Sequence, residues 1–210
     1  MDRNYWDSLA DCYEENLLEI AREDRAGALS KELEALGGEG IRVADLGCGP
    51  GSLLPLLARH FEEVIAVDYA EQLLDRARQR CRSKKVSYAC HDLSRGLELP
   101  FQVEVACCIN ALIDPDSGRR RGMLRSLRSA MRKQGVAIIV VPAFESVFHV
   151  YHTLRRIRER SGPPDGLSAD EAERLMGAEL QSFTDGIVRV GGTPTKYWMR
   201  EELIATLAQQ

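Results

Sequence analysis

The chain has 210 residues, of which 44% are hydrophobic and 29% are charged, and its formal net charge is −4. This length and balance suit one globular domain with a small appendage, and they exclude a disordered chain. No apolar run approaches the length of a bilayer span, and the acidic net charge gives no global attraction to nucleic acid.

Two amphipathic helices are expected before the first strand. Residues 4–20 place aromatic and aliphatic side chains on one stripe, and Asn4 can cap this helix. A second helix carries three leucines and stops at Gly37-Gly38. Residues 1–40 are therefore expected to form an N-terminal helical cap.

Residues 41–54 predict a strand, a tight turn and a helix. An apolar run reaches Asp45, and Gly47, Gly49 and Gly51 follow before a second apolar run at helical spacing. These glycines can adopt backbone angles that other residues avoid, and they leave no side chain between the backbone and a ligand. The start of the helix also brings free amides to this turn, where a negatively charged group is favoured.

The next two predicted strands are each followed by an acid. The strand at 64–67 is apolar throughout, which is typical of a parallel sheet, and it ends at Asp68. A carboxylate there can accept hydrogen bonds from both hydroxyls of a ribose. The strand at 86–90 is followed by Asp92, which is expected either to cap a turn or to accept from the exocyclic amine of an adenine.

Two further strands complete the predicted sheet. The fourth, at 103–109, ends at Asn110, and the fifth covers 136–141. Between them a helix is expected from about residue 117 to residue 134, with Gly135 after its end. The arginine-rich outer face of this helix is interpreted as a solvated face, because no aromatic residues are interleaved with the arginines.

The motif D-L-G-C-G-P-G at residues 45–51 resembles the first motif of the class I S-adenosylmethionine-dependent methyltransferases. Its G-x-G-x-G spacing differs from the G-x-G-x-x-G of nicotinamide dehydrogenases. The loop N-A-L-I-D-P-D resembles the family's N-x-L-x-H-x-D loop, although Asp114 replaces the histidine. The N-terminal Y-W-x-x-L-A-x-x-Y is similar to a family segment that folds over the cofactor; the alternative is that its aromatic side chains pack in the core.

This resemblance implies an α/β fold: a Rossmann-like doubly wound parallel sheet of order 3-2-1-4-5, with N-terminal helices and a helical lid. It implies S-adenosyl-L-methionine as cofactor, with Tyr69 against the adenine edge and the Leu93 amide donating to a ring nitrogen. The residues expected to bind the cofactor are Asp45, Gly47, Cys48, Gly49, Gly51, Asp68, Tyr69, Asp92, Leu93 and Asn110.

The expected organisation is a cofactor-binding core at 41–142, a lid and acceptor-site insertion at 143–195, and the start of the last core helix at 196–210. Within the lid we expect a long helix, a short helix that includes Leu180, and a strand at 187–190. His149, Tyr151 and His152 are candidates for a catalytic base by location alone. The two histidines have no third ligand, so no metal site is expected.

Family members continue with two more strands, for which no residues follow Gln210. The fifth strand would then have an open edge, and open edges are normally paired or covered. We expect either a contact with another chain, as in a homodimer, or coverage by the strand at 187–190. The alternative is that the chain is cut short.

The sequence thus predicts an enzyme that transfers a methyl group to an oxygen or nitrogen of an unidentified small-molecule acceptor. A catalytically silent methyltransferase-like binding subunit stays open because of Asp114 and the absent strands, and an NAD-dependent oxidoreductase is the remaining alternative. The six cysteines lack C-x-x-C spacing, and the first residues do not resemble a signal peptide. Reduced thiols, a cytoplasmic location, and no membrane or nucleic-acid partner are expected.

Overall fold

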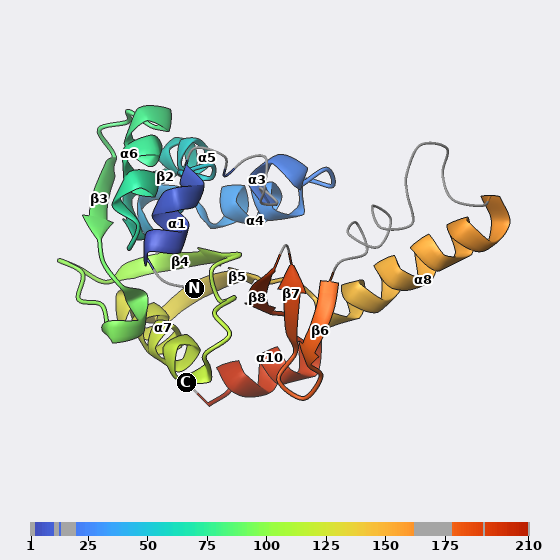
Figure 1. Cartoon of the computed structure of the whole chain (residues 1–210). Helices are drawn as coiled ribbons and strands as arrows, with labels where there is room; N and C mark the ends of the chain where they lie inside the picture. The colour runs from blue at the N-terminus through green and yellow to red at the C-terminus, as the bar shows by residue number, and fades with distance from the viewer. Residues whose placement is uncertain (1–2, 11–12, 14–19, 162–177, 191, 210) are drawn as a thin grey trace. The chain divides into compact units, whose positions relative to one another are not determined.

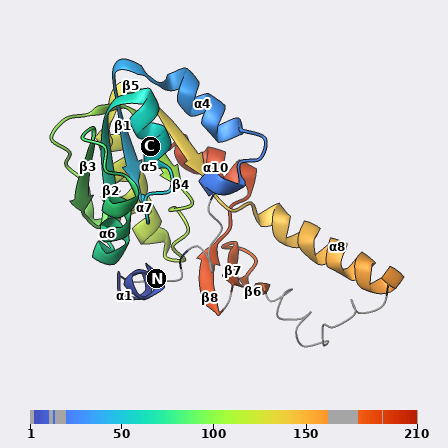
Figure 2. The ribbon, with the colours of Figure 1, turned by 90° about the horizontal axis from the view of Figure 1, so that it is seen from above.

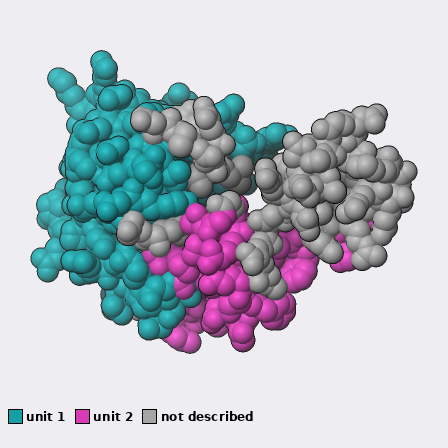
Figure 3. Space-filling model, viewed as in Figure 1, with its two compact units in different colours: residues 1–112, 116–140 teal, residues 113–115, 141–210 magenta. Residues whose placement is uncertain are grey.

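The structure is a computed structural model that describes all residues except 1–2, 11–12, 14–19, 162–177, 191 and 210. The chain divides into two compact units, coloured separately in Figure 3. Unit 1 comprises Met1–Leu112 and Asp116–Val140, and unit 2 comprises Ile113–Pro115 and Val141–Gln210.

A five-stranded parallel sheet forms the centre of unit 1, in the order β3-β2-β1-β4-β5 (Figures 1 and 2). This is the predicted order. In the middle strand, Val43 pairs with Val64 of β2 and with Val105 of β4, and all three side chains are buried. Burial on both faces explains why the central and carboxyl-terminal parts of these strands are mostly apolar. The strands are β1 (Gly38–Leu46), β2 (Phe61–Asp68), β3 (Val86–Cys90), β4 (Val103–Ile109) and β5 (Met131–Val140).

Helices lie on both faces of this sheet, as right-handed crossovers require. The helices α5 (Leu54–His60) and α6 (Glu71–Arg80) cover one face, and α7 (Ser117–Ala130) covers the other (Figure 1). A short 3-10 helix, η2 (Leu93–Arg95), follows β3. Pro55 lies in the first turn of α5, where its missing N–H breaks no intrahelical bond.

The N-terminal part of unit 1 contains α1 (Arg3–Leu9), α3 (Ile20–Glu23) and α4 (Ala28–Leu36). The helix predicted at 4–20 therefore coincides with α1 at its start, while most of its second half lies outside the described residues. The second predicted helix is α4, which ends where Gly37 donates its N–H to the carbonyl of Leu33.

The prediction that the helix after Asn110 runs to residue 134 is wrong. Helix α7 ends at Ala130, and Gly135 lies inside β5 rather than after the helix. The pairing of β4 with β5 shifts register between Val103 and Val105. A Cβ on Gly135 would approach the carbonyl oxygen of Glu104 to 3.1 Å, so a glycine suits this irregular point in the ladder.

In its described residues, unit 2 contains two helices and a small antiparallel sheet of order β6-β7-β8. The elements are α8 (Phe144–Ser161), β6 (Ala178–Ser182), β7 (Ile187–Val190), β8 (Thr193–Lys196) and α10 (Arg200–Leu207). The strand predicted at 187–190 is β7. The short helix expected around Leu180 is wrong at that residue, because Leu180 pairs with the buried Val188 in the sheet.

Lys196 joins the small sheet of unit 2 to α10. Its side chain is fully buried, and its ammonium donates to both carboxylate oxygens of Glu202, at 2.6 and 2.7 Å, and to the carbonyl of Asp185 at 2.7 Å. A buried ammonium needs such partners because its desolvation is costly. We therefore assign Lys196 a structural part in unit 2.

The outer edge of β5 has no paired strand among the described residues. The expectation that 187–190 covers this edge is wrong, since β7 pairs with β6 and β8 instead. The other expected outcome, a contact with a second chain, stays a prediction. Among the described helices, none combines the length and the apolar character that crossing a membrane demands.

Candidate functional site

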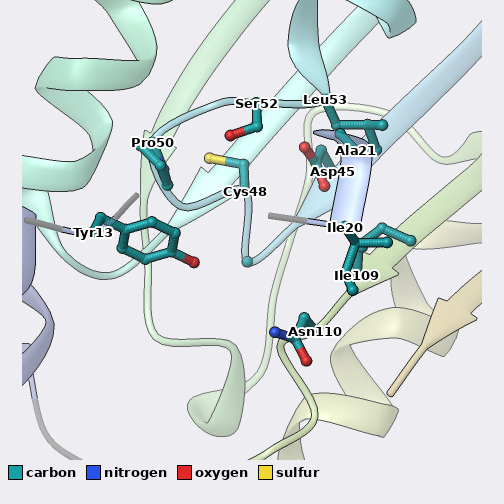
Figure 4. Close-up of a pocket in the computed structure, with 11 residues that line it drawn as sticks. Tyr13, Ile20, Ala21, Asp45, Cys48, Pro50, Ser52, Leu53, Ile109 and Asn110 are labelled. Atoms are coloured by element: carbon teal, nitrogen blue, oxygen red, sulfur yellow. The ribbon is translucent and has the colours of Figure 1, made fainter. Parts of the chain in front are cut away.

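A small pocket lies in unit 1 at the carboxyl ends of β1 and β4 (Figure 4). This is the switch point of the sheet, where β2 and β4 flank β1 on opposite sides and where ligands of open α/β sheets bind. Of the predicted cofactor residues, the pocket is lined by Asp45, Gly47, Cys48 and Asn110. The rest of the lining is Tyr13, Ile20, Ala21, Pro50, Ser52, Leu53 and Ile109.

The glycine loop leaves β1 in a backbone conformation that favours glycine. The φ angles of Gly47, Gly49 and Gly51 are 83°, 53° and 77°. A Cβ on Gly47 would lie 2.5 Å from the Cβ of Ala111, and one on Gly51 would lie 2.8 Å from the Cβ of Ala77. At these two positions the protein's own packing requires glycine, which the sequence interpretation attributed to the ligand.

Gly49 differs from its two neighbours in the loop. The three heavy atoms nearest to a Cβ there all belong to Tyr13, with its hydroxyl oxygen at 3.2 Å. The backbone N–H of Gly49 donates to Asp68 at 2.9 Å. Gly49 is buried and does not itself line the pocket, and Tyr13 lies over it.

The carboxylate of Asp68 joins the glycine loop to the start of α6. One oxygen accepts from Gly49, and the other accepts from the N–H of Ala70 at 3.0 Å. Burial raises the pKa of this carboxyl, and the backbone donors partly offset that effect. Each carboxylate oxygen has a second lone pair, so these contacts leave Asp68 able to accept from a ligand.

Asp45 is a second buried acid, and its side chain points into the pocket (Figure 4). Burial and the negative charge of Asp68 raise the pKa of Asp45 to about 7. Two acids that disfavour each other's ionisation beside one pocket form a site that favours a cation. The thiol of Cys48 in the same loop is also buried, and burial raises its pKa, so it is an inert thiol rather than a nucleophile.

Asn110 ends β4 in an unusual backbone conformation. Its φ is 55°, and no other non-glycine residue has a positive φ among the described residues. Its N–H donates to the carbonyl of Val140 at 2.7 Å, which holds the turn at the pocket. Strained backbone of this kind concentrates at functional sites, which supports the interpretation of Asn110 as a site residue.

Asp92 caps η2, as one of the two sequence interpretations proposed. Its carboxylate accepts from the hydroxyl and the N–H of Ser94, at 2.7 and 2.9 Å. Burial raises its pKa, but the hydrogen bonds from Ser94 and the charges of Arg119 and Arg95 outweigh burial, so the pKa is lowered. Neither Asp92 nor Leu93 lines the pocket as it stands, and the same is true of Asp68 and Tyr69.

Three residues of the N-terminal part line the pocket although none was among the predicted site residues: Tyr13, Ile20 and Ala21. The similarity of the Y-W segment to a cofactor-covering segment was the signal that could have included Tyr13. The packing interpretation is confirmed, because Trp6 and Tyr13 pack against the buried cluster of Ala10, Ala70 and Leu73. The covering of a cofactor by this segment stays a prediction.

The volume of the pocket is about 50 Å³, which is room for one or two water molecules. Pockets for small ligands typically have volumes of about 300–1,000 Å³. A nucleotide-sized ligand therefore requires the lining to move, and Tyr13 is the lining side chain that lies over the glycine loop.

The weak catalytic candidates lie on α8 of unit 2. His149 and His152 are exposed there, and the side chain of Tyr151 lies outside the described residues. Among the described residues, no group of three or more histidine, cysteine or acidic side chains is arranged to hold a metal ion.

Comparison with known proteins finds a family match within the region of the parallel sheet. Residues 43–135 match the family described as "Methyltransferase domain". The solved structure named "DhpI-SAM-HEP complex" is 18% identical, with a TM-score of 0.62 over 98% of this chain and 85% of that chain. This likeness shows a shared fold.

Two curated relatives are similar over part of their sequences. The tRNA 5-carboxymethoxyuridine methyltransferase of Escherichia coli (strain K12) is 28% identical over 148 residues, or 64% of this chain and 54% of that protein. A malonyl-(acyl-carrier protein) O-methyltransferase of Bacillus cereus is 27% identical over 122 residues, or 57% of this chain and 44% of that protein. The chain thus spans about half the length of these relatives.

Proposed function

We propose that this chain, which carries a methyltransferase domain and the fold of class I S-adenosylmethionine-dependent methyltransferases, transfers a methyl group from S-adenosyl-L-methionine to an acceptor. The observation that carries the proposal is the bond between Asp68 and the Gly49 amide at the switch point of the sheet. It brings the acid and the glycine loop together where a nucleoside would be recognised.

The residues at this point fit the cofactor. Asp68 would accept hydrogen bonds from the ribose, and Tyr69 and Leu93 would contact the adenine. Asp45 would face the positively charged methionyl part, because its ionised form gains from a nearby cation. The Gly49 backbone would approach the ligand once Tyr13 has moved. Asp92 keeps its capping bonds in this proposal and supports the Leu93 amide.

The sulfonium of S-adenosylmethionine is an activated methyl donor when bound. The protein then has to orient the acceptor and exclude water from the site. We propose that the acceptor is a small molecule methylated on oxygen or nitrogen. The names of the relatives give different acceptors, the 5-carboxymethoxyuridine of a tRNA and a malonyl-(acyl-carrier protein), so their names do not select one for this chain.

Calorimetry with S-adenosylhomocysteine and, separately, with NAD tests the cofactor. Binding of S-adenosylhomocysteine alone is expected, whereas tight binding of NAD alone would replace this proposal with an oxidoreductase. Turnover is then measured by mass spectrometry with a panel of hydroxyl and amine acceptors. A protein that binds S-adenosylhomocysteine but methylates no acceptor in the panel would favour a silent binding subunit.

A further inference from the structure

The first turn of α6 lacks a cap from its own segment. The residue at the N-cap position is Ala70, whose side chain cannot accept a hydrogen bond. The first amides of a helix have no intrahelical partner, and a side-chain oxygen at the N-cap normally accepts from the second or third of them. Helix α6 therefore needs an acceptor from elsewhere in the chain.

Asp7 of α1 supplies that acceptor. The N–H of Gln72, two residues after the N-cap, donates to Oδ1 of Asp7 at 3.1 Å. The two residues are 65 positions apart in the sequence, so this is a helix cap provided by a distant segment. Apolar packing holds the two elements together, because Trp6 and Tyr13 contact the buried cluster that includes Ala70.

Asp68 is held by one backbone donor in the glycine loop and one at the start of α6. Ala70, at the start of α6, donates to one carboxylate oxygen, and Gly49 donates to the other. Asp7 and Tyr13 of the N-terminal part lie beside these two donors. Asp7 accepts from Gln72 in the turn that follows Ala70, and the hydroxyl of Tyr13 lies over Gly49. The orientation of Asp68 therefore depends on how this segment is seated.

We propose that Asp7 is a positioning residue for the cofactor: by capping α6 from α1, it fixes the Ala70 amide and so the Asp68 carboxylate that receives the ribose. This inference rests on the proposed function of the site. Asp7 is absent from the pocket lining, so it can hold α1 on α6 while Tyr13 gives way to the ligand.

A purely electrostatic role for Asp7 has the opposite consequence. Its negative charge raises the pKa of Asp68, so removal of the charge would favour the ionised Asp68 and strengthen ribose binding. An asparagine at this position keeps an acceptor oxygen and is as good a cap as aspartate, but it has no charge. The variants Asp7→Ala and Asp7→Asn therefore separate the cap from the charge.

The experiment measures the affinity of the full chain for S-adenosylhomocysteine by calorimetry, together with hydrogen exchange at the Gln72 amide. We expect Asp7→Ala to weaken the affinity about fivefold, the usual effect of one helix cap on an equilibrium constant, and to speed exchange at Gln72. Asp7→Asn should stay close to the parent in both. Asp75→Ala is the control, because it removes an exposed acid of α6 that pairs with Arg78 and leaves α1 untouched.

Each other outcome overturns the proposal. Unchanged affinity in Asp7→Ala, even with faster exchange, would show that α1 only packs on α6. Equally tighter binding in Asp7→Ala and Asp7→Asn would assign the effect to charge, and an equal loss in both would refute the cap, because asparagine keeps the acceptor oxygen. A parent that does not bind S-adenosylhomocysteine would refute the proposed function itself, whereas a binding parent with an unaffected Asp7→Ala variant refutes this inference alone.

Discussion

The substitution Asp45→Asn is expected to stabilise the fold and to weaken cofactor binding. Asp45 is fully buried beside Asp68, and burial with that neighbouring charge raises its pKa to about 7. An acid whose pKa is higher in the folded chain than in the unfolded chain makes no difference to folding while it is protonated in both, and it opposes folding once it ionises. Asparagine has nearly the same shape and carries no charge, so it removes the destabilisation by the ionised carboxyl without leaving a cavity.

The size of the effect follows from the change in pKa. With an unfolded-state pKa of about 3.9, the carboxyl imposes no cost below about pH 4, and the cost is complete above about pH 7, at about 4 kcal/mol. Between about pH 5 and about pH 8 the cost grows by about 2.5 kcal/mol, or about 5–10 °C in thermal midpoint for a chain of this size. The variant should escape this loss.

The assay compares the thermal unfolding of the parent and Asp45→Asn, without cofactor, at both ends of that pH window. Asp68 is present in both proteins, so the difference between them isolates Asp45. The exposed Asp75→Asn is the control for the change in net charge. If Asp45→Asn gains no more stability at the higher pH than at the lower one, the reasoning from burial is wrong. Calorimetry on the same proteins should show weaker binding of S-adenosylhomocysteine, because we propose that Asp45 faces the methionyl part of the cofactor, whose amino group is positively charged.

Three further predictions concern Asp68, Gly49 of the glycine loop and the outer edge of β5. Asp68→Ala should weaken S-adenosylhomocysteine binding at least about tenfold, since two charge-assisted hydrogen bonds are lost; unchanged affinity in calorimetry would remove Asp68 from the ribose site. Gly49→Val should abolish binding, while Gly40→Val, which has a similar φ of 73° and open space around its Cβ, should retain it; equal binding by both would mean that the loop is not the cradle. Light scattering should show a dimer that Val136→Lys, at an exposed position of β5, converts to a monomer; a monomeric parent would contradict pairing at that edge.

The centre of the sheet could be predicted well because β1, β2 and β4 are buried on both faces over most of their length. A strand such as β4 must then be apolar at nearly every position, and its ends are marked by polar residues such as Asn110. The end of α7 could not be predicted in the same way. Residues 131–135 are compatible with a further helical turn, and only the pairing of Met131 with Val103 makes them part of β5.

The side chains of the site were harder to predict than its position. The sequence places Asp68 and Asp92 after neighbouring strands, and the structure confirms that placement. In the structure each carboxylate also accepts hydrogen bonds from backbone amides. Asp68 accepts from Gly49 and Ala70, and Asp92 accepts from Ser94. Such bonds depend on turn geometry, which an acid after a strand does not specify.

The contribution of the N-terminal segment depends on contacts between residues far apart in the chain. Ala70 occupies the N-cap position of α6, and its side chain cannot accept a hydrogen bond. The acceptor that replaces it, Asp7, has no sequence relation to α6 and is found only when the two helices are packed together. A residue that acts through a distant helix terminus therefore cannot be identified from the sequence around that helix. The structure identifies Asp7 as the acceptor at the start of α6.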